Sequence, residues 1–205
     1  MHVHSAFLPP GSIRQALADL VAAQEPAPRE ASSARKGLFG RRTPEEPAAP
    51  PGPLLDAYDA ERILLPITDF GFLASGDARR VADALTEVCA PLARPTVHIS
   101  GGAALVSPDD RSVWADVGGT DDELAAMRTV AQAVVSGVEP LGLYCDRRQF
   151  RPRFQIATIT DHTTVEHLEQ VLEALAAYTS EPWTIDAVAV LQRGAGIWRS
   201  VPIGG

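Results

Sequence analysis

The chain alternates between two spacings of apolar residues, one typical of strands and one typical of helices. Residues 62–68 place Ile63, Leu65 and Ile67 at every second position, which predicts a half-buried strand. Residues 13–21 instead repeat apolar side chains at the spacing of one helical face. By these two patterns we expect strands over 3–7, 62–68, 96–100, 112–117, 151–159, 183–191 and 197–201, and helices over 13–21, 77–88, 120–134 and 163–175.

Three local sequences predict where helices begin. Thr120 with Glu123 has the spacing of a capping box, in which each side chain accepts a hydrogen bond from the other residue's backbone amide. Thr163 with Glu166 repeats that spacing. Ser12 precedes the first helical stripe, and we expect it to cap that helix.

Turn residues between neighbouring strands favour antiparallel pairing. Gly101-Gly102 and residues 107–110, Ser-Pro-Asp-Asp, have the chemistry of tight turns. The pattern of strand followed by helix also occurs twice along the chain. We therefore expect one α+β domain over residues 1–205, two-lobed and pseudo-twofold, with mostly antiparallel sheets flanked by helices.

The composition changes sharply at about residues 24–53, which are rich in Pro, Ala, Glu, Arg and Ser and lack apolar periodicity. Such a segment buries too little surface to offset its ordering entropy, so we expect a disordered insertion. Residues 35–42 within it form a short basic patch with a hydrophobic centre. This patch is either part of a solvated linker or a docking segment for an acidic protein partner or a membrane surface.

Overall charge narrows the possible ligands. With 45% hydrophobic and 21% charged residues the chain has the composition of a soluble globular protein, and its net charge of −8 argues against non-specific polyanion binding. We expect no DNA binding, and any nucleotide or RNA site has to be a local basic pocket.

Two cysteines, Cys89 and Cys145, are too few for a disulfide framework and lack metal-ligand spacing, so we expect neither a metal nor a cofactor. The sequence has no apolar run of membrane-spanning length and no secretory signal at its start. The prediction is a cytoplasmic protein without membrane association.

Three stretches together resemble one known family. Residues 5–10 read Ser-Ala-Phe-Leu-Pro-Pro, residues 64–71 read Leu-Leu-Pro-Ile-Thr-Asp-Phe-Gly, and residues 150–157 read Phe-Arg-Pro-Arg-Phe-Gln-Ile-Ala. Their order and framing residues are similar to the two-histidine (2H) phosphoesterases, the 2′-5′ RNA ligase-like family, in which two His-x-Thr or His-x-Ser motifs face a central cleft.

The resemblance implies that both motifs are degenerate here. Leu64 and Pro66 stand at the first motif, and Arg153 and Gln155 at the second. Leucine cannot exchange a proton, proline offers neither a hydroxyl nor an N–H, and the guanidinium of Arg153 stays protonated. We therefore expect a pseudoenzyme with no catalytic residue. The resemblance implies a cyclic phosphodiesterase fold, in which active relatives carry out hydrolysis.

If the protein is inactive, we expect its cleft to be basic and to bind a phosphate. Arg153, Gln155 and Arg151 share one face of their strand by alternation, and Arg62 is expected on the cleft side of the opposite strand. Arginine forks bind phosphate oxygens well. These residues are the predicted ligand contacts.

Three functions remain open. The first is a catalytically inactive 2′-5′ RNA ligase-like protein that binds a nucleotide or RNA phosphate. The second is an active cyclic nucleotide or RNA phosphodiesterase with a relocated histidine such as His98, which begins a His-Ile-Ser triplet. The third is a protein-interaction module that uses the insertion. Four further histidines are weaker candidates, namely His2, His4, His162 and His167, the last predicted on the polar side of a helix.

Overall fold

A computed structural model describes residues 1–25, 52–107 and 110–205. The predicted insertion at about 24–53 falls almost entirely outside the described residues, so its disorder and its role in partner binding stay predictions. The helices are α1 (Gly11–Gln24), α2 (Ser75–Cys89), α3 (Asp121–Val138), the 3-10 turn η1 (Glu139–Leu141) and α4 (Val165–Ala177). The strands are β1 (His2–Phe7), β2 (Leu55–Ala57), β3 (Leu65–Phe72), β4 (Thr96–Val106), β5 (Arg111–Gly118), β6 (Arg153–Ile159), β7 (Trp183–Thr184), β8 (Ala187–Gln192) and β9 (Gly196–Pro202).

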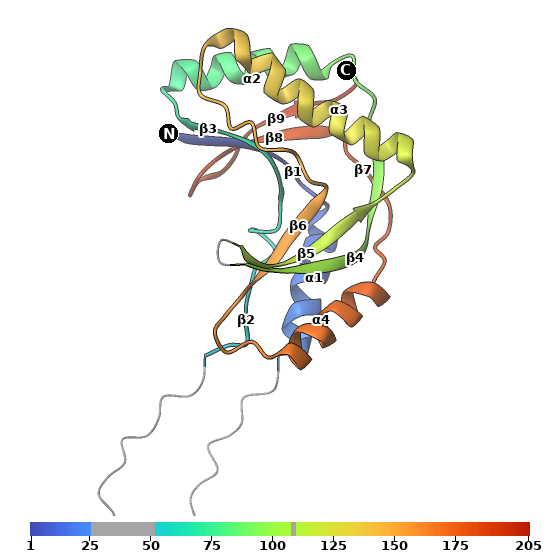
Figure 1. Cartoon of the computed structure of the whole chain (residues 1–205). Helices are drawn as coiled ribbons and strands as arrows, with labels where there is room; N and C mark the ends of the chain where they lie inside the picture. The colour runs from blue at the N-terminus through green and yellow to red at the C-terminus, as the bar shows by residue number, and fades with distance from the viewer. Residues whose placement is uncertain (26–51, 108–109) are drawn as a thin grey trace, which may run out of the picture.

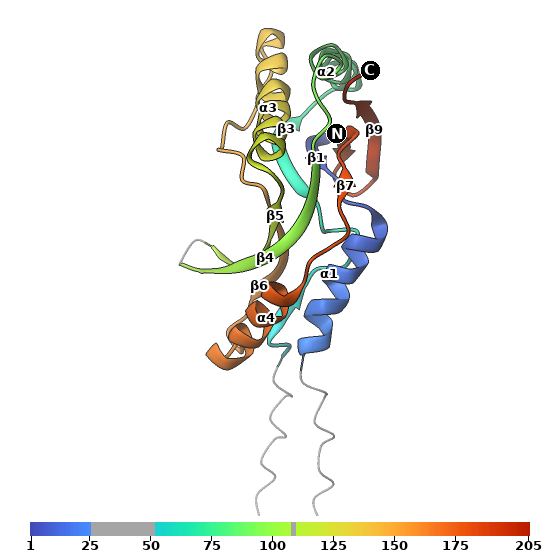
Figure 2. The same ribbon diagram turned by 90° about the vertical axis from the view of Figure 1, so that its right-hand side faces the viewer.

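The strands form two antiparallel sheets. One has the order β3-β1-β8-β9 and the other the order β2-β6-β5-β4-β7. Helices α2 and α3 pack together beside the first sheet, while α1 and α4 pack together beside the second (Figures 1 and 2). The predicted α+β class, with antiparallel sheets flanked by helices, is confirmed.

A shared apolar core joins the two sheets. Phe7 on β1, Phe70 on β3 and Phe154 on β6 are each at most 1% exposed and belong to one cluster of buried residues. Burying one such ring is worth about 1.5–3 kcal/mol, so these rings hold the sheets at a fixed distance. The polar faces of β3 and β6 are therefore fixed relative to each other as well.

The strand predicted over 62–68 begins and ends three or four residues later than expected, as β3 over Leu65–Phe72. Ile63 and Leu65 are buried as the alternation predicts. Arg62, however, belongs to a turn, because its amide donates to the carbonyl and the side-chain oxygen of Asp59. Because of this turn, β3 begins only at Leu65. Arg62 lies outside the sheet, and this changes which residues can line the site.

The helix starts were predicted with mixed success. The Thr120–Glu123 capping box of α3 is confirmed, with both reciprocal bonds present. The prediction for Thr163 was wrong, because Thr164 caps α4 and accepts from the His167 amide. Ser12 was also wrong as a cap: α1 begins at Gly11 after Pro10, whose carbonyl accepts the first helical amides.

His167 lies on a buried face of α4 and is only 4% exposed, so its predicted surface position was wrong. Its Nε2 lies 3.6 Å from the carboxylate of Glu25, which follows α1. The same carboxylate accepts the amides of Leu54 and Leu55. Packing of α1 against α4 covers a face that is polar in sequence, and it leaves His167 Nε2 near Glu25 but without a hydrogen-bond partner. Within the residues described, no helix is long and apolar enough to cross a membrane.

Candidate functional site

A cleft of about 600 Å³ lies between the polar faces of the two sheets. Strand β1 contributes His4, β3 contributes residues 66–69, β5 contributes Trp114 and β6 contributes Arg153. The other lining residues are Leu105 of β4, Asp110, Asp146, residues 148–151 before β6, and Arg193 in the β8–β9 turn. Residues from both sheets thus meet in one cavity.

Pro66 and Thr68 line the cleft together with Ile67 and Asp69, whereas Leu64, which precedes β3, does not. Leu64, Pro66 and Thr68 share one face by alternation, but Leu64 packs against Ala6 and Leu191 in a small apolar cluster. The hydroxyl of Thr68 donates to the backbone carbonyl of Asp146 at 2.6 Å. It therefore fastens the wall of the cleft and is already engaged by the protein.

Arg153 lines the cleft, and its guanidinium is poorly paired. Its Nε lies 3.6 Å from Asp116, the residue opposite it on β5, and the side chain is 30% exposed. Arg151 also lines the cleft, and among the described residues no carboxylate lies within 4.0 Å of it. Two cationic side chains are thereby presented to the cavity from one end of β6.

The other two predicted ligand contacts lie elsewhere. Gln155 is not part of the cavity wall and donates to the hydroxyl of Ser112 at 3.1 Å. The guanidinium of Arg62 stacks on the ring of Tyr58 at 3.8 Å from its centroid, outside the cleft. The turn before β3 directs Arg62 there, which alternation within a strand could not foresee.

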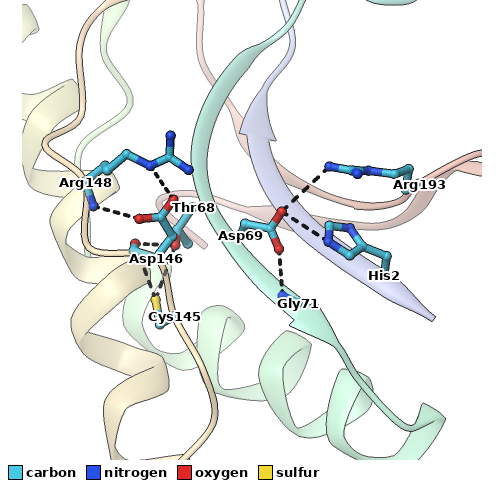
Figure 3. Close-up of polar contacts among 8 residues, drawn as sticks. All are labelled: His2, Thr68, Asp69, Gly71, Cys145, Asp146, Arg148 and Arg193. Carbon is cyan, nitrogen blue, oxygen red and sulfur yellow. Dashed lines mark hydrogen bonds and ion pairs between the residues drawn. The ribbon is translucent and has the colours of Figure 1, made fainter. Parts of the chain in front are cut away.

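Asp69, an aspartate that lines the cleft, has three donors around its carboxylate (Figure 3). Asp69 accepts the amide of Gly71 at 2.6 Å, and its other oxygen lies 3.4 Å from His2 Nε2 and 3.9 Å from Arg193 Nη2. These contacts bring Arg193, from the far end of the chain, beside β1 and β3. Its role was missed because nothing in its local sequence distinguishes it.

His4 lies in the same region and lines the cavity. Burial is the main cause that lowers the pKa of His4 below its usual value of 6.5. Asp69 acts in the opposite direction, while Arg193 and His2 lower the pKa further. The alternation of His2 and His4 on one face of the strand was the sequence signal that could have identified His4 as a cleft residue.

A second carboxylate fixes the segment that carries the remaining arginines. Asp146 accepts from the backbone amide of Arg148 at 3.1 Å and from its Nε at 2.7 Å (Figure 3). The amide of Asp146 in turn donates to the carbonyl of Asp69. The segment is thus attached to the edge of β3, and Arg148 is held where it lines the cleft.

Comparison with solved structures identifies the architecture. TT0787 of Thermus thermophilus aligns over 100% of this chain and 99% of its own, with a TM-score of 0.60 and 13% identity. E. coli LigT complexed with 3′-AMP covers 98% and 94% of the two chains, with a TM-score of 0.53 and 14% identity. The MHV ns2 PDE domain covers 93% and 98%, with a TM-score of 0.51 and 11% identity. This is the two-histidine phosphoesterase fold.

Sequence comparison adds no closer relationship. No family model matches the chain, and no curated protein matches it. At 11–14% identity the likeness to these three structures extends to the fold alone. The chemistry of the site therefore has to be argued from the residues of this chain.

The other histidines do not line the cleft of this two-histidine fold. His98 lies on β4 opposite Gly118, and its ring fills the space where a Cβ on that glycine would project. His162 lies beside Gly52 in the same way. Among the described residues, His4 is the one histidine that lines the cavity.

Among the described residues, half of the unpaired buried polar atoms belong to residues of the cleft wall. In the described part of the chain six buried side-chain nitrogens have no hydrogen-bond partner, and three of them belong to His4, Trp114 and Arg153. Buried polar groups in folded proteins are nearly always bonded, so each exception requires an explanation. Three of the exceptions belong to residues that line one cavity.

Proposed function

We propose that this chain binds the phosphate of a nucleotide or RNA in the cleft and does not hydrolyse it. The observation that carries the proposal is Arg153, a permanent cation with an unpaired Nε, at the position that the resemblance gives to the second catalytic histidine. Arg148, Arg151 and Arg193 line the same cavity. With Arg153 they give the cleft four arginines against three aspartates, and this local positive balance is what a protein of net charge −8 needs in order to hold an anion.

The donors in the wall suit a phosphate. Guanidinium groups present planar forks of N–H donors that match pairs of phosphate oxygens. The indole N–H of Trp114 is a further unpaired donor. A volume of about 600 Å³ lies within the usual range for small-molecule sites, so a nucleotide would fit beside these donors.

The same residues argue against hydrolysis. Two-histidine catalysis needs one group that accepts a proton and one that donates it. Arg153 cannot accept one at physiological pH, Pro66 has no proton to give, and the Thr68 hydroxyl is engaged by the segment before β6. Each acid or base contributes about 10²–10⁴ in rate, so their joint loss removes roughly 5–11 kcal/mol of transition-state stabilisation.

His4 supports the second candidate, an active cyclic phosphodiesterase. It lines the cavity, and burial keeps its pKa low, so at neutral pH the imidazole is uncharged and able to accept a proton. Of the two candidates for a relocated histidine, the geometry favours His4 over His98. The described residues supply no second imidazole in the cleft, which is why binding without turnover is the preferred function.

Calorimetric titration with 3′-AMP and with 2′,3′-cyclic AMP tests the proposal. We expect saturable binding of at least one ligand, a loss of about tenfold in affinity for Arg153→Ala, and no change for Arg62→Ala, the matched control outside the cleft. Unchanged affinity in Arg153→Ala, or no binding by the wild type, contradicts the proposal. Hydrolysis of the cyclic ligand that disappears in His4→Gln would establish the enzyme instead.

A further inference from the structure

A second cavity, of about 310 Å³, lies on the other side of the segment that carries the cleft arginines. Helix α3 forms one wall with Arg128 and Gln132, and residues 147–150 form the other. Four residues line both cavities, namely Ile67, Arg148, Gln149 and Phe150. The segment 148–150 is therefore a partition between two adjoining spaces.

The partition is held at both ends. At its start the amide of Asp146 donates to the carbonyl of Asp69. The carboxylate of Asp146 accepts from the guanidinium of Arg148 (Figure 3). At its end the carbonyl of Pro152 accepts the amide of Val117 on β5. Because both attachments are to strands, the two cavities keep their relative positions.

Charge distinguishes the second cavity from the cleft. Its lining includes Arg128, Arg147 and Arg148 and no carboxylate. The cleft is lined by four arginines but also by Asp69, Asp110 and Asp146. Arg147 pairs with Glu139 at 3.0 Å and Arg148 pairs with Asp146 at 2.7 Å, whereas no carboxylate of the described chain lies within 4.0 Å of Arg128. In an acidic protein, this lining favours an anion.

Apart from Gln132 and Gln149, the remaining lining is apolar. Ala131 and Val135 of α3, Ile67 of β3 and Phe150 surround the arginines. A flat heterocyclic base bears apolar faces that suit such a surface, and the phosphate beside it suits the guanidinium groups. The combination fits one nucleotide unit.

We propose that the second cavity binds a second nucleotide, so that the ligand is an oligonucleotide of at least two units with phosphates on either side of residues 148–150. This inference rests on the proposed function, because the first unit occupies the cleft. Arg148, which lines both cavities, contacts the connecting phosphate. A mononucleotide uses the cleft alone.

Titration with the 5′-phosphorylated dinucleotide pApA and with 3′-AMP tests this inference. Arg128→Ala is expected to weaken pApA binding about fivefold to tenfold and to leave 3′-AMP within twofold. Arg79→Ala is the matched control: this exposed helical arginine lies on α2, outside both cavities. Since each phosphate contact on a single strand contributes about 0.7 to the salt dependence of log K, the slope for pApA should fall by about that amount in Arg128→Ala.

The outcomes separate the two proposals. If Arg128→Ala binds pApA as tightly as the wild type while Arg153→Ala is weakened, the second cavity is not a nucleotide site and the cleft remains one. Equal weakening by Arg128→Ala and Arg79→Ala reflects net charge alone and also overturns the inference. If the wild type binds neither ligand, the proposed function fails and this inference fails with it.

Discussion

Asp116 competes with a bound phosphate for Arg153, so Asp116→Asn should strengthen ligand binding. The two residues face each other across β5 and β6, with Arg153 Nε 3.6 Å from Asp116 Oδ1. Their geometry falls just outside hydrogen-bonding distance, and Arg153 Nε is left without a partner. The substitution keeps the size of the side chain and removes one negative charge from the neighbourhood of the cleft.

The magnitude follows from distance and exposure. Two unit charges about 4 Å apart attract by about 4 kcal/mol at an effective dielectric constant near 20. The side chains are 30% and 37% exposed, so solvent screening reduces the net value to about 1 kcal/mol or less. Releasing Arg153 and removing the repulsion between Asp116 and the ligand should therefore raise affinity about fivefold, at a cost in folding stability of no more than about 1 kcal/mol.

Titration with 3′-AMP at low and at high salt measures this effect. The gain should shrink in high salt, because screening weakens both the pair and the repulsion. Asp83→Asn is the matched control: Asp83 pairs with Arg199 at 3.2 Å and lies outside the cleft, so the same charge change should leave affinity within twofold. Weaker binding by Asp116→Asn would refute this reasoning and would mean that Asp116 orients Arg153 for the ligand. An equal gain in affinity in Asp83→Asn would show that the gain comes from the change in net charge alone.

Three further predictions concern the fold around the cleft. Because the pKa of His4 is lowered on folding, the unfolded chain takes up its proton first; the free energy of unfolding should therefore decrease as pH falls through 6.5, and urea melts of His4→Gln should lack this component. Burial raises the pKa of Cys89 to about 11, so a thiol reagent should label half-buried Cys145 first, and Cys145→Ser should show slow labelling limited by unfolding. Early labelling in that variant would refute the buried position. Gly102→Ala would place a Cβ 2.5 Å from a backbone carbonyl oxygen of β5 and should destabilise by about 1–3 kcal/mol in thermal melts. Gly118→Ala is its control, since the ring of a histidine can move away, and an equal loss in both would contradict the reasoning.

Local patterns in the sequence predicted most of the elements and most of the buried positions; His167 of α4 and the short strand β2 are exceptions. The alternation over 153–159 places Phe154 in the core and Arg153 on the opposite face, as the structure has them. The Thr120–Glu123 box marks the start of α3 because both partners lie within one helical turn. Such features depend on neighbours in sequence, and this is why they could be predicted.

The composition of the cavity was decided by tertiary packing. Alternation assigns Leu64, Pro66 and Thr68 to one face, but the place where the second sheet approaches selects the last two as cleft residues. His4 and Arg193 meet beside Asp69 only because β1 pairs with both β3 and β8. The sequence of one strand predicts which face of the strand each side chain is on. Which distant side chains it meets depends on the long-range pairing of the strands and on where the two sheets separate to leave a cavity.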